Sequence, residues 1–242
     1  MVSRTISSED IQVIFEDSKI LVVNKPAGIR TIRDGYNASL PFLGNILKQK
    51  YGDLWVVHRL DRETSGVLII AKDANTHRYL NTEFQNRRVS KTYHAIVNGN
   101  PTWDLITIDA PLLVDGDRHH RTIVSLEDGK PALTKCMVIE RFKNYCLFEV
   151  QPYTGYTHQI RAHLLSIGFP ITNDLVYCPK STRIKRSANL LKKQLQNLPL
   201  TRLCLHAYRL SFEHPAKSRI AEFTAEYPDD FKAALLSLRE II

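Results

Sequence analysis

The sequence predicts an α+β fold with a mixed, mostly antiparallel central sheet flanked by helices. Short apolar runs rich in β-branched residues outnumber the segments with helical spacing. Most of these runs follow one another without an intervening helix, which argues against a doubly wound parallel sheet. No repeat, low-complexity linker or change of composition divides the 242 residues. We therefore expect one domain over residues 1–242.

The strands are expected where apolar residues alternate or form short β-branched runs between turn residues. These runs lie at residues 11–25 (two strands), 54–60, 66–72, 92–99, 132–142, 145–153, 203–214 and 219–227. Residues 100–130 are rich in Pro, Gly and Asp, which predicts a hairpin-like region with exposed loops.

Helices are expected where apolar residues recur every three to four positions. This spacing is found at residues 40–50, 75–84, 157–168 and 228–239. Ser39 and Thr157 are candidate N-terminal caps, and Gly168 is a candidate C-terminal stop.

The chain is basic, with a net charge of +8 and a pI near 9.3. Such a charge favours a polyanionic partner, above all nucleic acid, although a solvated basic surface gives the same balance. Residues 179–199 are especially basic and suit phosphate contacts, but a solvated helix or loop is the alternative. The basic residues of this segment are Lys180, Arg183, Lys185, Arg186, Lys192 and Lys193.

The four cysteines form no CxxC pair of the kind found in zinc ribbons. Most of them lie in apolar, strand-like runs, so we expect buried, reduced thiols, as in the cytosol. The N-terminus has no apolar signal core, and no apolar run approaches the ~20 residues of a membrane span. We expect a soluble, cytoplasmic protein that does not bind membranes.

The segment VHRLDRETSGVLIIAKD, residues 57–73, concentrates charge between two apolar runs. Asp61 lies between Arg59 and Arg62, whose guanidinium groups favour the ionised carboxylate. An ionised Asp in a cleft serves as a nucleophile or a base, whereas a turn Asp in a surface ion pair is the alternative. Residues 64–66 are expected to shape the turn, and His58 to make a structural hydrogen bond.

The segment THQIRAH places His158 and Arg161 in the first turn of a predicted helix. A helix N-terminus together with Arg is a good anion site, so Arg161 could pair with a carboxylate or a phosphate. For His158 and His163 the alternative is capping or core packing, and their spacing of five does not suit a metal site. Tyr93, in KTYHA, could stack on a base or be a half-buried strand residue.

Several segments together resemble the RluA family of RNA pseudouridine synthases. The matching segments are DSKILVVNKPAG (17–28), HRLDRETSGVLIIAKD (58–73), KTYHAIVNG (91–99), TGYTHQIRAHLLSIGFPITND (154–174) and LHAYRLSFEHP (205–215). They occur in the family's order and span nearly the entire chain.

The resemblance implies an isomerase that converts selected uridines of structured rRNA or tRNA to pseudouridine, without a cofactor or metal. Asp61 matches the essential aspartate, and Arg161 the basic residue that pairs with it. Tyr93 matches the tyrosine that packs on the target base, and Arg59 the arginine that fills the space left by the flipped uridine. The family fold has a central catalytic cleft. We further expect RNA contacts from His158, Lys180, Arg183, Lys185 and Arg186.

The chain departs from the family pattern at a few positions. Tyr156 replaces a usual Arg, Ile32 a frequent His, and Asn173 and Cys178 common glycines. We expect no separate N-terminal RNA-binding module and no obligate protein partner, so a monomer. The route taken by Asp61 stays open, since it could attack C1′, add to C6 of the base, or remove the C2′ proton. The alternative function is a catalytically inactive RNA-binding or chaperone protein on the same fold.

Overall fold

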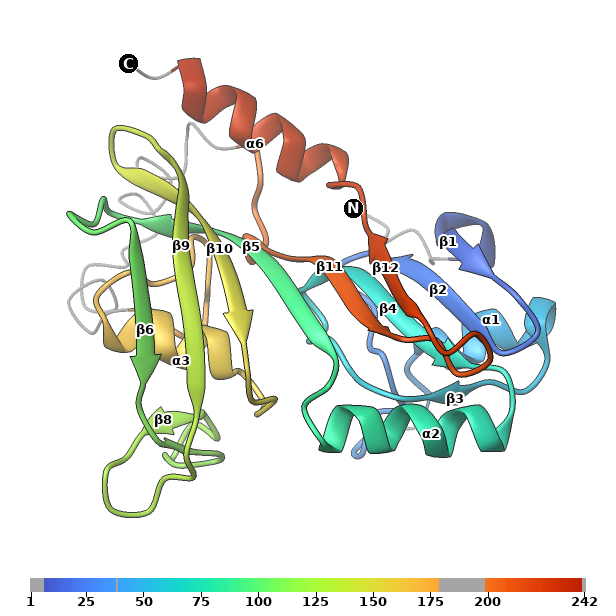
Figure 1. The fold of residues 1–242 in the computed structure, drawn as a ribbon. Helices are drawn as coiled ribbons and strands as arrows, with labels where there is room; N and C mark the ends of the chain where they lie inside the picture. Colours follow the sequence, from blue (N-terminus) through green and yellow to red (C-terminus); the bar gives the residue numbers. More distant parts are fainter. Residues whose placement is uncertain (1–6, 38, 179–198, 241–242) are drawn as a thin grey trace. The chain divides into compact units, whose positions relative to one another are not determined.

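The computed structural model describes residues 7–37, 39–178 and 199–240, which divide into two compact units (Figure 1). The first unit contains the chain up to Lys91 together with His206–Glu226. The second contains Thr92–Leu205 and the chain from Tyr227 onward. Each unit has its own strands and helices, and neither unit is a continuous stretch of sequence.

The secondary structure agrees with the predicted α+β class. The helices are the 3-10 turn η1 (Ser8–Asp10), α1 (Leu43–Tyr51), α2 (Ala74–Gln85), α3 (Gln159–Ser166) and α6 (Asp229–Glu240). The strands are β1 (Gln12–Glu16), β2 (Ile20–Lys25), β3 (Trp55–Val56), β4 (Ser65–Ala71), β5 (Ser90–Asn98), β6 (Leu105–Asp109), β7 (Leu112–Leu113), β8 (Ile123–Val124), β9 (Leu133–Arg141), β10 (Tyr145–Pro152), β11 (Leu205–Glu213) and β12 (Ile220–Thr224).

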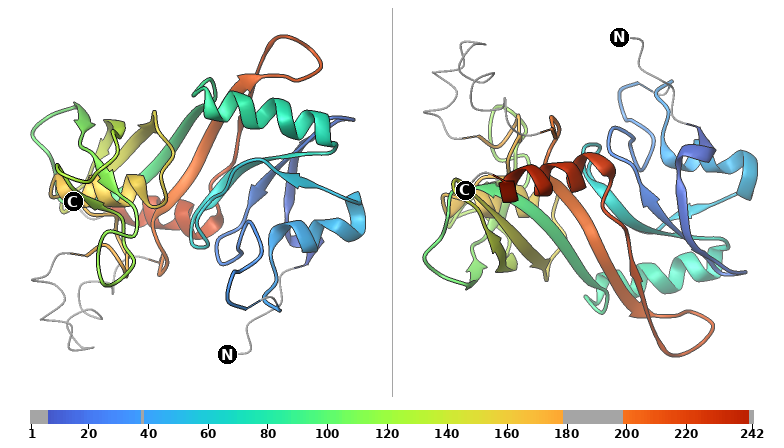
Figure 2. Two further views of the ribbon diagram at one scale, coloured as in Figure 1. Left: turned by 90° about the horizontal axis from the view of Figure 1, so that it is seen from below. Right: turned by 90° about the horizontal axis from the view of Figure 1, so that it is seen from above.

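The strands of the first unit lie in the order β1-β2-β4-β11, with β3 also paired to β4 and β12 to β11. Its pairs are antiparallel except β4 with β11, which is parallel, so the sheet is mixed as predicted. Strand β4 is buried along its whole length, as a run of Val, Leu and Ile flanked on both sides requires. Helix α2 packs beside β3 and β4 (Figures 1 and 2).

Helix α1 starts later than the sequence pattern suggests. Its N-cap is Phe42 rather than Ser39, and no side chain caps it. The Ser39 hydroxyl instead donates to Asn37 Oδ1 at 2.7 Å within the preceding loop. The predicted cap is therefore wrong, because a local turn takes the hydroxyl before the helix begins. Helix α2 follows the expected rule, with the Asp73 side chain accepting the Thr76 N–H.

The strands of the second unit lie in the order β5-β10-β9-β6, and all three pairs are antiparallel. The predicted pair of strands around residues 143–144 is confirmed as β9 and β10. The hairpin-like region is confirmed by the antiparallel pair β7–β8, whereas β6 pairs with β9 instead.

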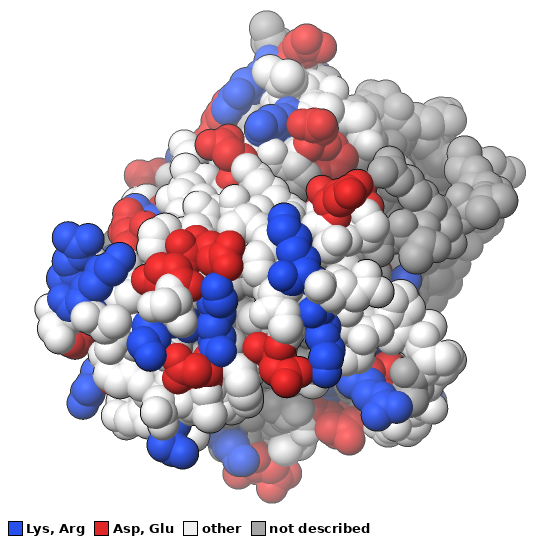
Figure 3. Space-filling model, turned by 90° about the vertical axis from the view of Figure 1, so that its right-hand side faces the viewer, with Lys and Arg blue, Asp and Glu red and all other residues white. Residues whose placement is uncertain are grey.

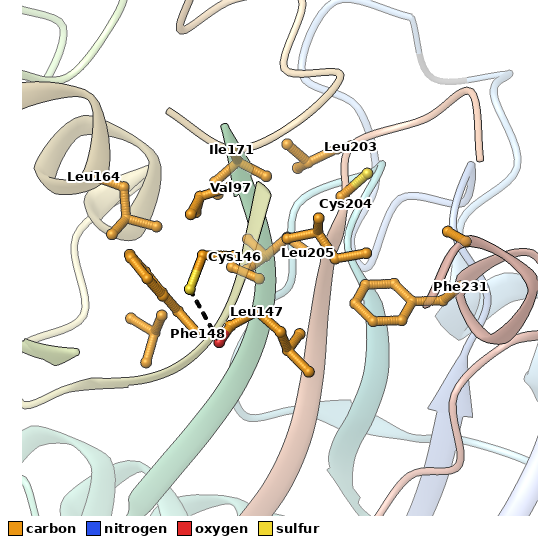
Figure 4. Packing of buried hydrophobic residues seen from close by; sticks show 14 of the residues in the cluster. Val97, Cys146, Leu147, Phe148, Leu164, Ile171, Leu203, Cys204, Leu205 and Phe231 are labelled. Carbon is orange, nitrogen blue, oxygen red and sulfur yellow. Dashed lines mark hydrogen bonds between the residues drawn. The ribbon is translucent and has the colours of Figure 1, made fainter. Parts of the chain in front are cut away.

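The core of the second unit surrounds β10. Cys146, Leu147 and Phe148 are consecutive and all buried, so both faces of the strand are covered. Helix α3 contributes Leu164 to this cluster and helix α6 contributes Phe231 (Figure 4). All four cysteines of the chain are buried and free, as predicted.

Candidate functional site

The segment that carries Asp61 is a loop between β3 and β4 in the first unit. The sequence predicts a strand over 54–60, but β3 ends at Val56. The reason is His58, whose Nε2 accepts the backbone N–H of Ile69 at 3.1 Å, where a continued β3 would have paired with β4. His58 also stacks on Phe84, with ring centroids 4.7 Å apart. Its predicted role as a structural hydrogen-bonding group is confirmed.

Hydrogen bonds fix the backbone on both sides of Asp61. The buried Thr31 hydroxyl donates to the Leu60 carbonyl at 2.9 Å and accepts the Leu60 N–H at 3.1 Å. The Thr64 N–H donates to the Asp61 carbonyl at 3.1 Å, which closes the turn. The Asp61 carboxylate is therefore presented from a turn with little freedom, as the sequence analysis expects of residues 64–66.

A buried lysine joins this loop to the loop after β2. Lys25 is fully buried, and its Nζ donates to the carbonyls of Pro26 and Ile29, both at 2.9 Å, and of Arg62 at 3.3 Å. The Gly28 N–H also donates to the Arg62 carbonyl, at 2.8 Å. A buried ammonium group needs several acceptors, and these carbonyls supply them. Lys25 thus links two loops that are 37 residues apart in the sequence.

Gly66 is confirmed as a position that other residues avoid. Its φ is +122°, and a Cβ there would lie 2.1 Å from the Ala207 carbonyl oxygen of β11. The neighbouring Ser65 hydroxyl lies 3.0 Å from Nδ1 of the buried His206, whose Nε2 lies 3.1 Å from the Ala225 carbonyl oxygen. The turn after Asp61 is therefore anchored by close backbone packing at Gly66 and by the buried hydrogen bonds of Ser65 and His206.

The two arginines that flank Asp61 differ in their contacts. Arg59 is exposed, whereas Arg62 donates to the Gly28 carbonyl at 3.1 Å and lies 3.3 Å from Glu63.

Burial lowers the pKa of Lys91 to about 8, and the Arg87 charge adds to this effect. Burial also lowers the pKa of His58 to about 3, with a contribution from the Lys91 charge. His58 is therefore neutral at neutral pH, as an acceptor of the Ile69 N–H must be.

Arg161 lies on α3 in the second unit and forms a buried ion pair with Asp174. Its Nε donates to Oδ2 at 2.7 Å and its Nη2 to Oδ1 at 2.8 Å. Burial alone raises the pKa of Asp174, but the Arg161 bonds and charge and the N–H groups of Tyr177 and Val176 outweigh it and lower that pKa. The guanidinium also lies over the Tyr177 ring, 4.8 Å from its centroid.

His158 precedes α3 instead of lying in its first turn. It is the N-cap and has left-handed backbone angles, φ 57° and ψ 18°, while Thr157 is not the cap. The predicted cap is wrong because the Gln159 side chain holds the entry turn, with Oε1 accepting the Tyr156 N–H and the Thr154 hydroxyl. His158 Nδ1 lies 3.1 Å from the Tyr177 hydroxyl. Gly168 ends the helix as predicted, at φ +86°.

The predicted site residues are thus distributed over both units. Asp61 and Arg59 belong to the first unit, and Tyr93, His158 and Arg161 to the second. Tyr93 lies on β5, half-buried against the core of the second unit. Pairing of Arg161 with Asp61 and stacking by Tyr93 stay predictions. Lys180, Arg183, Lys185 and Arg186 lie outside the described residues.

Two residues that organise the site segments, Lys25 and Asp174, were not predicted from the sequence. The pattern that could have indicated them is a single charged residue inside an apolar run, as in ILVVNKP and FPITNDLVY.

Two of the departures from the family pattern, at residues 173 and 156, lie in described segments. Asn173, next to Asp174, has a φ of +60°, which explains why glycine suits this position and why Asn replaces it readily. The Tyr156 hydroxyl donates to the Pro131 carbonyl at 3.3 Å.

The positive charge is unevenly distributed. Residues 179–198 alone contribute six positive charges and no acidic residue to the net charge of +8. On the face of the molecule shown in Figure 3, Lys and Arg side chains alternate with Asp and Glu. The excess of positive charge is therefore not gathered on that face.

The described residues contain neither a candidate metal site nor a candidate membrane-spanning helix. Among residues 7–37, 39–178 and 199–240, no group of three or more His, Cys, Asp or Glu side chains is placed to hold a metal ion. None of the helices in these same ranges has the length and apolar character needed to cross a membrane.

Comparison with known proteins gives consistent matches. A family model described as RNA pseudouridylate synthase matches residues 19–166. Ribosomal large subunit pseudouridine synthase C of Haemophilus influenzae is 37% identical over 231 residues, covering 95% of this chain and 69% of that protein. Ribosomal large subunit pseudouridine synthase D of Zymomonas mobilis is 36% identical over 243 residues, covering 95% of this chain and 74% of that protein.

The fold gives a similar result. The solved structure titled human RNA pseudouridylate synthase domain containing 4 matches with a TM-score of 0.74 and 28% identity. The match covers 94% of this chain and 93% of the human one. The match to the family model includes Arg59, Asp61, Tyr93, His158 and Arg161.

Proposed function

The chain belongs to the RluA family of RNA pseudouridine synthases. On this basis we propose that it converts specific uridines of ribosomal or transfer RNA to pseudouridine, with Asp61 as the reacting residue. Members of this family are isomerases. The reaction breaks the N1–C1′ bond of a uridine and joins C5 to C1′. The proton at C5 leaves to solvent and N1 gains one, so no electrons are exchanged.

The observation that carries the proposal is the way the Asp61 turn is held. Backbone bonds at Leu60 and Thr64 and the Lys25 contacts to Arg62 leave this segment few alternative conformations. A reacting carboxylate gains from such fixed placement, since misplacement by about 1 Å costs on the order of 10²-fold in rate. Asp61 itself is half-buried, which leaves part of the residue exposed.

The roles of the other residues follow from the physical demands of the reaction. A uridine inside a stem must leave the stack before its glycosidic bond is accessible, which costs a few kcal/mol. Exposed Arg59 fills the vacated space, and Tyr93 packs on the extruded base, which offsets part of that cost. Arg161 pairs with the Asp61 carboxylate and orients it toward the uridine.

The substrate is structured RNA, and the names of the relatives favour ribosomal RNA of the large subunit as the first candidate. Transfer RNA is the second. The basic residues Lys180, Arg183, Lys185 and Arg186 supply phosphate contacts, and His158 adds a contact near the start of α3.

The test is tritium release from rRNA and tRNA that carry 5-tritiated uridine, prepared from cells lacking this gene. The wild-type protein is expected to release tritium, and Asp61→Asn to lower the rate by at least ~10³-fold without a change in melting temperature. Asp53→Asn is the matched control, because Asp53 is an exposed Asp in the same unit. Pseudouridine mapping then identifies the nucleotide.

The alternative is an inactive RNA-binding or chaperone protein. It predicts no tritium release from either RNA by the folded wild-type protein, together with RNA binding that Asp61→Asn leaves unchanged. That combination would refute the proposed isomerase activity for this chain.

A further inference from the structure

The loop between β2 and α1 exposes an aromatic side chain at its tip. Tyr36 is 104% exposed, so its ring contacts nothing that lowers its solvent accessibility. Ile32 in the same loop is 41% exposed, and Arg33 is exposed between them. Single exposed apolar residues are common, but an exposed aromatic next to an exposed Arg and Ile on one loop is typical of a binding surface.

The loop tip is held in one conformation by a carboxylate. Asp34 Oδ1 accepts the N–H groups of Tyr36 at 3.0 Å and Asn37 at 2.8 Å. Its other oxygen lies 2.8 Å from Arg30 Nε. The backbone N–H groups of Asn37 and Tyr36, and then Arg30, lower the pKa of Asp34, so it stays ionised. The exposed ring therefore projects from an ordered turn, which reduces the entropy lost on binding.

The base of the loop is bonded to the residue that precedes Asp61. Thr31, next to Ile32, makes the two buried hydrogen bonds with the Leu60 backbone. The Leu43 N–H donates to the Arg30 carbonyl at 2.8 Å and closes the loop at its far end. All of these residues belong to the first unit, and the Thr31 bonds join the base of the loop to the Asp61 turn.

We propose that Tyr36 stacks on an unpaired nucleotide of the substrate RNA that flanks the target uridine, with Ile32 and Arg33 beside it. Stacking on an exposed ring suits any base, and Arg33 adds a contact to the adjacent phosphate. Tyr36 then contributes to substrate affinity and to the choice of target, while the chemistry stays with Asp61. The inference rests on the proposed function, because it assumes that RNA reaches the Asp61 turn.

The kinetic test compares Tyr36→Ala and Tyr36→Phe with wild type in the tritium-release assay on rRNA. Tyr36→Ala is expected to raise KM about 5- to 150-fold with kcat unchanged, since stacking contributes ~1–3 kcal/mol per base. Tyr36→Phe is expected to keep the wild-type KM, because stacking uses the ring and not the hydroxyl. The control is Ile220→Ala, another exposed apolar residue of the first unit. An unchanged KM for Tyr36→Ala overturns the inference.

A second measurement does not depend on turnover. A photo-cross-linking amino acid is placed at position 36 or at position 220 of the Asp61→Asn protein, which is mixed with rRNA and irradiated. Cross-links from position 36 to nucleotides beside the target uridine, and none from position 220, support the inference. Cross-links from position 36 only to protein overturn it. A wild-type protein without tritium release whose position 36 still cross-links to RNA refutes the proposed activity and supports the RNA contact.

Discussion

Arg161 and Asp174 form a two-point ion pair in which both side chains are almost completely buried, with N–O distances of 2.7 and 2.8 Å. The pair fixes the plane of the guanidinium at the start of α3. Asp174 also accepts the N–H groups of Val176 and Tyr177, both at 2.9 Å. The Asp174 carboxylate therefore orders both Arg161 and the turn at residues 174–177. This turn follows Ile171, which forms an isolated bridge with Val97 of β5.

Removal of the Asp174 charge is expected to destabilise the protein strongly. Asp174→Asn leaves a buried guanidinium without its counter-charge, at a cost of about 3–5 kcal/mol in the free energy of unfolding. Asp230→Asn is the matched control, since Arg202 binds Asp230 with the same geometry but at a more exposed site. We expect that control to cost about 1 kcal/mol or less. Urea unfolding measures both, and equal costs would contradict the prediction.

Lys25 offers a test of the link between the two loops of the first unit. Lys25→Met removes the ammonium donor to three carbonyls, of which the Arg62 carbonyl keeps the Gly28 N–H, and we expect this to cost about 3 kcal/mol. The exposed Lys48 serves as the control, and Lys48→Met is expected to change stability by less than about 0.5 kcal/mol. Thermal unfolding distinguishes them. A Lys25→Met protein as stable as wild type would show that the carbonyls find other donors.

Gly66 and Gly28 both have positive φ, but only Gly66 faces another backbone. Gly66→Ala places a Cβ 2.1 Å from the Ala207 carbonyl oxygen and is expected to cost about 4 kcal/mol or more. Gly28→Ala meets no atom within 4 Å, so only its backbone strain remains, about 1–2 kcal/mol. Unfolding of the two variants side by side separates contact from strain, and a similar loss in both would rule out the contact.

His58 predicts a loss of stability in acid. Its pKa is about 3 in the folded protein against about 6.5 when unfolded. The unfolded chain therefore binds an extra proton between these values, so stability is complete above pH 6.5 and falls as the pH is lowered toward 3. His58→Gln can still accept the Ile69 N–H but does not titrate, so we expect a smaller loss of unfolding free energy between pH 7 and 5. An identical pH slope in both proteins would exclude this role.

The periodicity of the chain determined most of the secondary structure. Strands in segments such as 145–153 and helices such as 75–84 form where apolar residues alternate or recur at helical spacing, because burial then selects one conformation. Gly66 and His58 were also assigned correctly, since few roles suit a glycine or a histidine in that turn. The family motifs pointed to Asp61 as the reacting residue, a role that stays a proposal.

Other features depended on specific polar contacts, most of them between distant segments. The early end of β3 results from a bond between His58 and Ile69, and the delayed start of α1 from a local turn at Asn37. The partners of Lys25 and Arg161 are separated from them by up to 37 residues in the sequence. The sequence by itself determined which residues are apolar, charged or able to turn. Only the tertiary structure decided which polar groups meet, because a buried charge takes whichever partner the fold brings within hydrogen-bond distance.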